Sequence, residues 1–154
     1  IKLGLVTDGI IKDQDEYSPT LTMNSIGRHI STMGYIKVMS NLSPWLRKAE
    51  LGSVYANPAS HGEGRFVAQS KDIEKFIANG QIATMYADLD LSPNIGDNYN
   101  FNGSYMAVEG MSSPDGKVFG KMLHSERIGR GVSINIYGEQ DMKIFESGVE
   151  YFTA

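Results

Sequence analysis

The sequence has 154 residues, enough for one domain that buries about two-thirds of the surface its unfolded chain exposes. Hydrophobic residues make up 41% of it, which excludes a disordered chain, and the absence of cysteine excludes disulfides and thiolate metal sites. The net charge of −4, without a long cationic run, argues against a nucleic-acid partner. No apolar run reaches the roughly 18 residues of a membrane span, and no signal segment opens the sequence. We therefore expect a cytoplasmic protein without membrane contact.

The first predicted elements are a helix end, a loop and a strand. Residues 1–6 are typical of the last turn of a helix, because Gly4 suits a left-handed C-terminal cap. The polar segment 12–24 is long enough to be a functional loop. Apolar residues alternate around Gly34 in residues 28–39, which predicts one strand or a bent pair.

A short helix and a pair of strands follow. Ser43 can cap the helix and Pro44 can take its first position, and Trp45 is expected in the core. Residues 53–68 contain two β-rich runs around a Gly-Glu-Gly segment, so we expect strands that meet at a tight bend.

The clearest helix covers residues 70–80, with Ser70 as its cap and Gly80 at its end. Its apolar stripe consists of Ile73, Phe76 and Ile77. The next segment, 81–88, is a predicted strand, and residues 89–104 are a predicted loop because they are rich in Asn, Gly, Pro and Asp.

The last third predicts a hairpin and a terminal helix. Residues 104–111 and 117–123 are strands joined by a Ser-Ser-Pro-Asp-Gly turn, and residues 139–152 form the helix. One face of this helix carries Met142, Phe145, Val149 and Phe152. Strands mixed with helices predict an α/β sandwich with a mixed sheet, and loops of functional interest at one sheet edge.

His124 and Glu126 stand at the end of the apolar segment "GKVFGKMLHSER", residues 116–127. In extended backbone two such residues project to the same side, so the carboxylate can fix the imidazole tautomer and leave the other ring nitrogen as a base. This is the arrangement of base and orienter in a catalytic triad. The alternative is a solvated pair on the surface.

Three other patterns leave alternatives open. "SHGEGRF" is either a bend where main-chain groups approach a ligand or an ordinary hairpin, and it lacks the frame of a phosphate loop. "NFNGS", residues 100–104, either places amides in a site or forms an Asn-Gly turn. A zinc site is a further alternative, although no pair has the close spacing of zinc motifs, so we expect no metal. Its ligands would be His29, His61, His124 and Glu126.

Taken together, "SHGEGRFVA", "NFNGS" with "AVEGMSSPDGKVFGKM", and "HSER" resemble in order and spacing the glutaminase domains of phosphoribosylformylglycinamidine synthases, which are class I glutamine amidotransferases. The resemblance covers nearly the whole chain. It implies a flavodoxin-like α/β sandwich, with His124 as the base and Glu126 as the orienter. In the family this segment reads His-Pro-Glu-Arg, so Ser125 replaces a proline and stiffens the loop less.

The resemblance implies release of ammonia from glutamine through a glutamyl thioester, for ATP-dependent amidation of formylglycinamide ribonucleotide in purine synthesis. ATP and Mg²⁺ would act in a partner synthase domain, and no cofactor is expected in this chain. The resemblance also suggests contacts to glutamine. They are Asn24, Arg28, His61, Gly62, Asn102, Gly103 and Ser104.

The family's cysteine lies in an elbow between a strand and a helix, and residues 1–6 resemble the end of that helix. We therefore expect residues 1–154 to be the C-terminal part of one glutaminase domain, incomplete on its N-terminal side, with the nucleophile just upstream of Ile1. The missing N-terminal segment would then be a binding partner. The rival interpretation is a non-catalytic, amidotransferase-like module that serves as an interface or senses a ligand, and the lack of cysteine favours it if the chain is complete.

Overall fold

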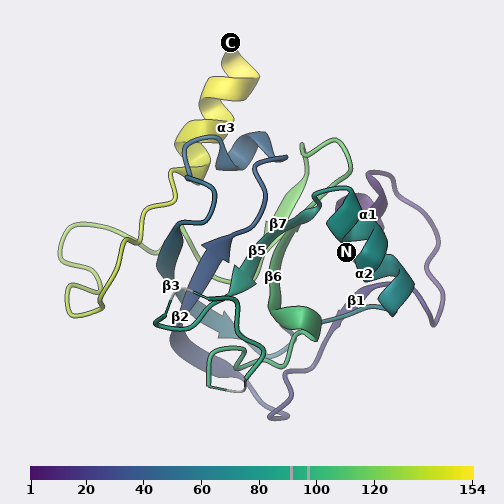
Figure 1. The fold of residues 1–154 in the computed structure, drawn as a ribbon, viewed down its shortest axis with the longest axis horizontal. Coiled ribbons are helices and arrows are strands. Elements are labelled where there is room, and N and C mark those ends of the chain that lie inside the picture. The colour runs from purple at the N-terminus through teal and green to yellow at the C-terminus, as the bar shows by residue number, and fades with distance from the viewer. Residues whose placement is uncertain (91, 97) are drawn as a thin grey trace.

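The computed structural model describes residues 1–90, 92–96 and 98–154, and its centre is a five-stranded sheet (Figure 1). In spatial order the strands are β3 (Val54–His61), β2 (Ile30–Val38), β5 (Ile82–Tyr86), β6 (Val108–Ser112) and β7 (Phe119–Lys121). All four pairings are antiparallel. Parallel pairing in the described residues is limited to an isolated bridge between Tyr55 and Glu139, so the described strands form an antiparallel sheet and not the predicted mixed one.

β2 is the longest strand and pairs with both β3 and β5, from Ile30 opposite His61 to Ile36 opposite Tyr86. Gly34 in its middle has a packing reason. A Cβ there would lie 2.8 Å from the Phe101 ring and 3.0 Å from Leu123, so the glycine lets both side chains lie against the strand.

The bend at residues 62–64 was correctly predicted. It separates β3 from β4 (Arg65–Val67), which pairs with β1 (Thr20–Thr22) in a second, two-stranded sheet. The strand predicted from residue 104 begins only at Val108, because η2 (Tyr105–Ala107) precedes it with positive φ at Met106 and Ala107. Residues 91 and 97 of the predicted loop lie outside the described residues.

α1 (Leu5–Asp8) and α2 (Ser70–Ala78) lie together on one side of the sheet (Figure 1). Gly4 has φ 84°, the expected left-handed conformation, but it precedes α1 instead of ending a helix. Ile73 and Phe76 of α2 are buried in one apolar cluster with residues of β4, β5 and β6. The predicted cap at Ser70 is wrong, because Gln69 holds the cap position and the Ser70 hydroxyl contacts the Tyr105 hydroxyl instead.

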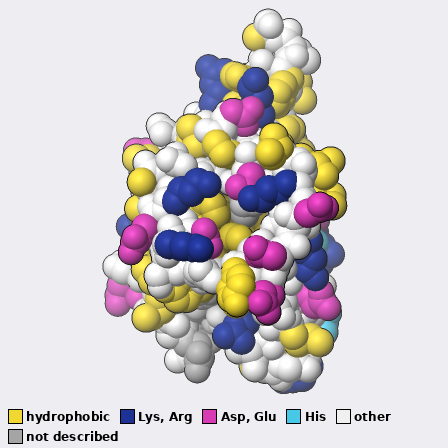
Figure 2. Space-filling view, turned by 90° about the vertical axis from the view of Figure 1, so that its right-hand side faces the viewer, with side chains coloured by type: hydrophobic (Ala, Val, Ile, Leu, Met, Phe, Trp, Pro, Cys, Tyr) yellow, Lys and Arg dark blue, Asp and Glu magenta, His cyan; other side chains and the backbone are white. Residues whose placement is uncertain are grey.

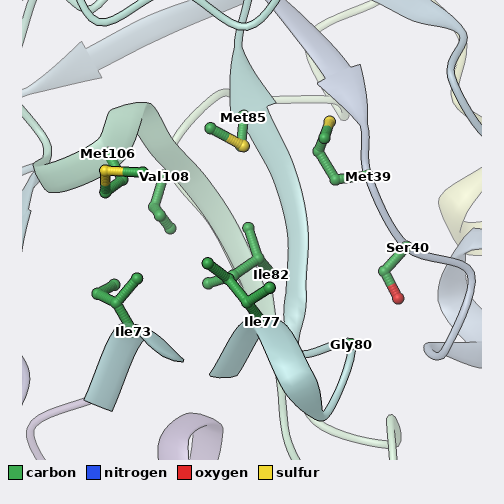
Figure 3. A pocket seen from close by; sticks show the side chains of 9 residues that line it. All are labelled: Met39, Ser40, Ile73, Ile77, Gly80, Ile82, Met85, Met106 and Val108. Atoms are coloured by element: carbon green, nitrogen blue, oxygen red, sulfur yellow. The ribbon is translucent and has the colours of Figure 1, made fainter. Parts of the chain in front are cut away.

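Ile77 is 57% exposed, so the predicted stripe of α2 is only partly buried. Its side chain lines an apolar hollow of about 220 Å³ between α2, β5 and β6 (Figure 3). The other lining residues are Met39, Ser40, Ile73, Gly80, Ile82, Met85, Met106 and Val108. Ser40 supplies the hollow's polar side chain, so this space does not suit a zwitterionic amino acid.

η1 (Pro44–Leu46) has Pro44 at its first position, as predicted. Ser43 holds the predicted cap position, but its hydroxyl makes no capping hydrogen bond and donates to the Gly116 carbonyl at 2.8 Å instead. Trp45 is only half-buried. Its indole N–H donates to the Lys117 carbonyl at 2.8 Å, which ties η1 to the β6–β7 hairpin.

The terminal helix α3 (Ile144–Thr153) is shorter than predicted and projects from the body of the molecule (Figure 1). Met142 is buried but precedes it. The rest of the predicted apolar face is exposed: Phe145 by 60%, Val149 by 62% and Phe152 by 52%. Gly148 lies against Trp45, since a Cβ there would be 2.2 Å from the Trp45 ring, and the Phe152 ring lies 5.5 Å from the same indole between centroids.

The face that carries α1 and α2 shows Lys, Arg, Asp and Glu side chains interspersed, without a continuous area of one sign (Figure 2). Several of them form ion pairs, among them Lys12 with Asp8 at 3.0 Å. Among the described residues, no helix is long and apolar enough to cross a membrane.

Candidate active site

The segment after β7 turns back to the opposite edge of the sheet and carries His124 there. Leu123 is buried in the core, and the His124 amide donates to the Pro58 carbonyl of β3 at 2.8 Å. The Arg127 amide then donates to the His124 carbonyl at 3.3 Å, which closes a turn. His124 and Glu126 therefore lie on a turn, and the extended backbone assumed from the sequence is not what brings them together.

The His124 and Glu126 side chains are in direct contact, with 2.6 Å between Nδ1 and Oε1. An ionised carboxylate is only an acceptor, so Nδ1 must carry the proton, and Nε2 keeps a lone pair. The His124 side chain is 29% exposed. The carboxylate therefore lies where it can orient the imidazole, and the roles of base and orienter stay predictions.

The surroundings of Glu126 favour the ionised form of its carboxyl group. Burial raises the pKa of this carboxyl, but hydrogen bonds from the backbone and from His124, with the charges of His124 and Arg127, outweigh burial and hold the pKa below its usual value. Arg127 Nε lies 3.9 Å from Glu126 Oε1. The carboxylate thus stays ionised at neutral pH and keeps accepting from Nδ1.

The pair borders a hollow of about 370 Å³ between the β7 segment and the start of α3. Its walls are mostly apolar and aromatic. They are formed by Trp45, Phe119, Gly120, Lys121, Met122, Leu123, Ser125, Ile144 and Phe145, together with the pair.

Beneath the pair lies a buried polar network that sequence analysis missed. The Glu109 side chain is fully buried and that of Lys121 is 9% exposed, with 3.6 Å between Nζ and Oε1. Lys121 also donates to the hydroxyl of Ser125, which is buried. The available signal was a charged residue within each apolar strand of the hairpin, Glu109 in β6 and Lys121 in β7.

The residues predicted to contact glutamine gather where three loops meet. These loops are residues 23–29, 62–64 and 98–104, and we call their contact the three-loop cluster. Asn24, Asn102 and Ser104 are buried, and their polar atoms are used inside the protein. The Asn102 amide donates to the Gly64 carbonyl and to the Tyr86 hydroxyl, each at 2.8 Å. The Ser104 hydroxyl accepts from the Phe66 amide at 3.1 Å. These side chains therefore hold the loops together, which is a role the sequence prediction did not give them.

Asn24 is the central residue of this cluster. Its Nδ2 donates to the carbonyls of Arg28 and His61, at 3.0 and 2.7 Å. Its Oδ1 accepts from the Gly64 amide at 3.1 Å and lies 3.0 Å from Nδ1 of His61. Because Oδ1 is an acceptor, His61 is protonated at Nδ1, and its buried Nε2 has no hydrogen-bond partner among the described residues.

His61 is half-buried, and its ring stacks on Phe101 with 6.4 Å between centroids. Burial lowers its pKa, the charges of His29 and His124 lower it further, and Glu109 opposes them. His61 follows Pro58 by three residues of strand, so it lies about 10 Å along β3 from the point where His124 attaches. The three-loop cluster and the His124–Glu126 pair thus share the β3 edge.

The other predicted contacts differ in how freely they can meet a ligand. The Arg28 side chain is exposed, and a Cβ on Gly62 would meet nothing within 4 Å. Gly103 has φ 75° and accepts from Arg65 Nε at 3.1 Å, so it is a turn residue in the cluster. Residues 1–90, 92–96 and 98–154 contain no group of three or more His, Cys, Asp or Glu side chains that could hold a metal.

Comparison with known proteins decides the family. The model of the CobB/CobQ-like glutamine amidotransferase domain matches residues 1–152. The chain belongs to this family. The amidotransferase class expected from the sequence is therefore confirmed.

Curated relatives are subunits of one synthase. The chain is 33% identical over 128 residues to phosphoribosylformylglycinamidine synthase subunit PurQ of Chlorobaculum tepidum, covering 82% of this chain and 52% of the relative. It is 31% identical over 123 residues to the same subunit of Aquifex aeolicus, covering 80% and 50%. The chain thus spans about half the length of the curated relatives it matches.

A solved structure shares the fold. A chain in the structure of PurLQS from Thermotoga maritima matches with a TM-score of 0.63 and 27% identity, covering 88% of this chain and 53% of that one. The predicted α/β amidotransferase-like fold class is thereby confirmed. The roles of individual side chains stay predictions.

Proposed function

We propose that this chain supplies the proton-transfer half of a glutaminase site, with His124 as base and acid and Glu126 as its orienter. The observation that carries the proposal is the 2.6 Å contact between Nδ1 and Oε1, which leaves Nε2 free, in a chain of the amidotransferase family. The 154 residues contain no cysteine, so the nucleophile has to come from residues outside them. We place it upstream of Ile1, in the N-terminal part of the same domain.

In the proposed reaction, Nε2 of His124 takes the proton of the cysteine thiol, and the thiolate adds to the amide carbonyl of glutamine. Nε2 then gives this proton to the amide nitrogen, the C–N bond breaks and ammonia leaves a glutamyl thioester. Next, Nε2 takes a proton from water as the water oxygen adds to the thioester carbonyl. The C–S bond breaks, Nε2 returns this proton to the sulfur, and the products are glutamate and the free thiol.

We further propose that the ammonia is used by a synthase partner, for ATP-dependent amidation of formylglycinamide ribonucleotide in purine biosynthesis. The names of the relatives and of the PurLQS structure support this choice of partner. ATP and Mg²⁺ would be bound by the synthase and not by this chain. A cytoplasmic location remains a prediction from the sequence.

For glutamine itself, we propose contacts at the exposed Arg28 side chain and at the open backbone around Gly62. Asn24, Asn102 and Ser104 would act indirectly, because their polar atoms already bond to the loops that they join. His61 and Gly103 would shape the same cluster.

Covalent trapping tests the proposal. The full-length gene product is treated with a glutamine analogue that carries an electrophilic diazoketone, and the labelled residue is located by peptide mass spectrometry. We expect the label on a cysteine outside residues 1–154, and His124→Ala should slow labelling by about 10²-fold or more. Absence of labelling, with glutamine binding that His124→Ala does not change, would instead support a non-catalytic module.

A further inference from the structure

The carboxylate of Glu109 connects strand β5 and the segment that leads to His124. Its Oε2 accepts from the Thr84 hydroxyl of β5. Its Oε1 accepts from the backbone amides of Met122 and Leu123, at 2.9 and 2.6 Å. A fully buried carboxylate thus fixes the two residues that immediately precede His124.

Lys121 fixes the same segment from its other side. Its Nζ donates to the Leu123 carbonyl at 2.6 Å and to the Ser125 hydroxyl at 3.0 Å, the residues on either side of His124. The Ser125 hydroxyl in turn donates to Asn57 Oδ1 in β3 at 3.1 Å. The backbone around the imidazole is therefore held by one buried cation and one buried anion.

Stability alone is a weak reason for such a pair. A buried ion pair costs several kcal/mol of desolvation per ion, and apolar residues of similar size often stabilise a fold as well or better. Burial also lowers the pKa of Lys121, although Glu109 and then Glu126 oppose this shift. The hydrogen bonds of the two side chains converge on residues 122–125, so their shared effect is on the conformation of the turn.

We propose that Glu109 and Lys121 are positioning residues that hold the His124–Glu126 turn in the geometry for proton transfer, an inference that rests on the proposed function of that pair. Proline at position 125 would restrict the turn through its fixed φ, whereas serine does not. In this chain the lysine bonds to Ser125 and Leu123 supply that restriction. Neither positioning residue needs to touch glutamine.

The test uses Glu109→Gln/Lys121→Met in the full-length gene product with its synthase. Glutamine at 109 keeps an oxygen for the Met122 and Leu123 amides, and the double change leaves no unpaired buried charge. We expect kcat with glutamine to fall by about 10- to 100-fold, since small misplacements of a catalytic group cost this much. KM for glutamine and the rate with ammonium should stay near wild type. Lys117→Met, which removes an exposed lysine from the same hairpin, is the control and should change neither.

Two further readouts separate positioning from a structural role. In ¹⁵N NMR spectra, the Nδ1 proton of His124 should lose its strong hydrogen-bonded shift in the double variant, while the fold measured by circular dichroism is kept. Adding Ser125→Pro to the double variant should restore several-fold of the lost kcat, because proline restricts the turn without lysine. In the described residues the Ser125 amide donates no hydrogen bond that proline would remove.

A folded double variant with wild-type kcat and an unchanged Nδ1 proton shift would overturn the proposal. If the double variant does not fold, Ser125→Ala decides in its place: a several-fold loss of kcat supports the proposal, and an unchanged kcat overturns it. Full glutamine-dependent activity in His124→Ala would mean that the proposed function itself has failed. Inactive His124→Ala beside an active double variant would mean that only the positioning role has failed.

Discussion

Replacing Asn24 by alanine tests whether the three-loop cluster is a structural unit. The side chain is 2% exposed and makes four hydrogen bonds, to the Arg28 and His61 carbonyls, the Gly64 amide and the His61 ring. Each such bond contributes about 1 kcal/mol net, and water can reach part of the emptied site. We therefore expect Asn24→Ala to lower the free energy of unfolding by about 2–4 kcal/mol.

Urea unfolding of the full-length gene product measures this loss, with circular dichroism and Trp45 fluorescence as probes. Arg28→Ala is the matched control, because the bond to Arg28 uses only its carbonyl and its side chain is exposed. The control should change stability by less than about 0.5 kcal/mol. If Asn24→Ala were as stable as the control and raised KM for glutamine, Asn24 would be a ligand contact and our reasoning would be wrong.

Three further predictions concern the same cluster and the proposed source of the nucleophile. Burial lowers the pKa of His61 in the folded protein. As the pH falls through the ordinary histidine pKa of about 6.5, the unfolded chain therefore binds this proton before the folded protein does. Wild type should therefore lose unfolding free energy relative to His61→Phe as the pH falls from about 7 to 5, and parallel stability curves would contradict this. Gly64→Ala should destabilise by about 1–3 kcal/mol, since the new Cβ would lie 2.2 Å from the His61 ring; a double-mutant cycle should show that His61→Ala relieves much of this cost. Residues 1–154 alone should release no glutamate from glutamine above buffer, because they contain no cysteine; measurable release would refute the need for an outside thiol.

Sequence reasoning located the His124–Glu126 pair because residues two apart can meet in extended backbone, and the observed turn also lets them meet, whereas a helix would point them apart. It also found the bend at residues 62–64, since glycines mark positions where strands end. It did not find the Glu109–Lys121 network, because nothing local shows that two charged residues in neighbouring strands face the core instead of solvent. Only the burial and the contact of the two side chains in the folded protein reveal this.

The errors at helix ends have a physical cause. Ser43 and Ser70 have the residue type of a cap, but tertiary partners at Gly116 and Tyr105 engage their hydroxyls. The apolar stripe of α3 predicted a buried face, yet Phe145 and Val149 are exposed, while Ser147 and Gly148 are buried. An amphipathic pattern predicts which residues of a helix favour burial. It does not predict whether a neighbouring surface is present to cover them.

The most direct test of the central claim is a parallel assay of His124→Ala with glutamine and with ammonium as the nitrogen source, in the full-length gene product with its synthase. The imidazole is needed only to liberate ammonia, so amidation with glutamine should fall on the order of 10⁴-fold while the rate with ammonium stays close to wild type. Glu126→Ala should act in the same direction but more weakly, because it loosens the tautomer and orientation of the imidazole without removing it. Equal losses with both nitrogen sources, or no loss with either, would contradict the assignment of His124 as the base.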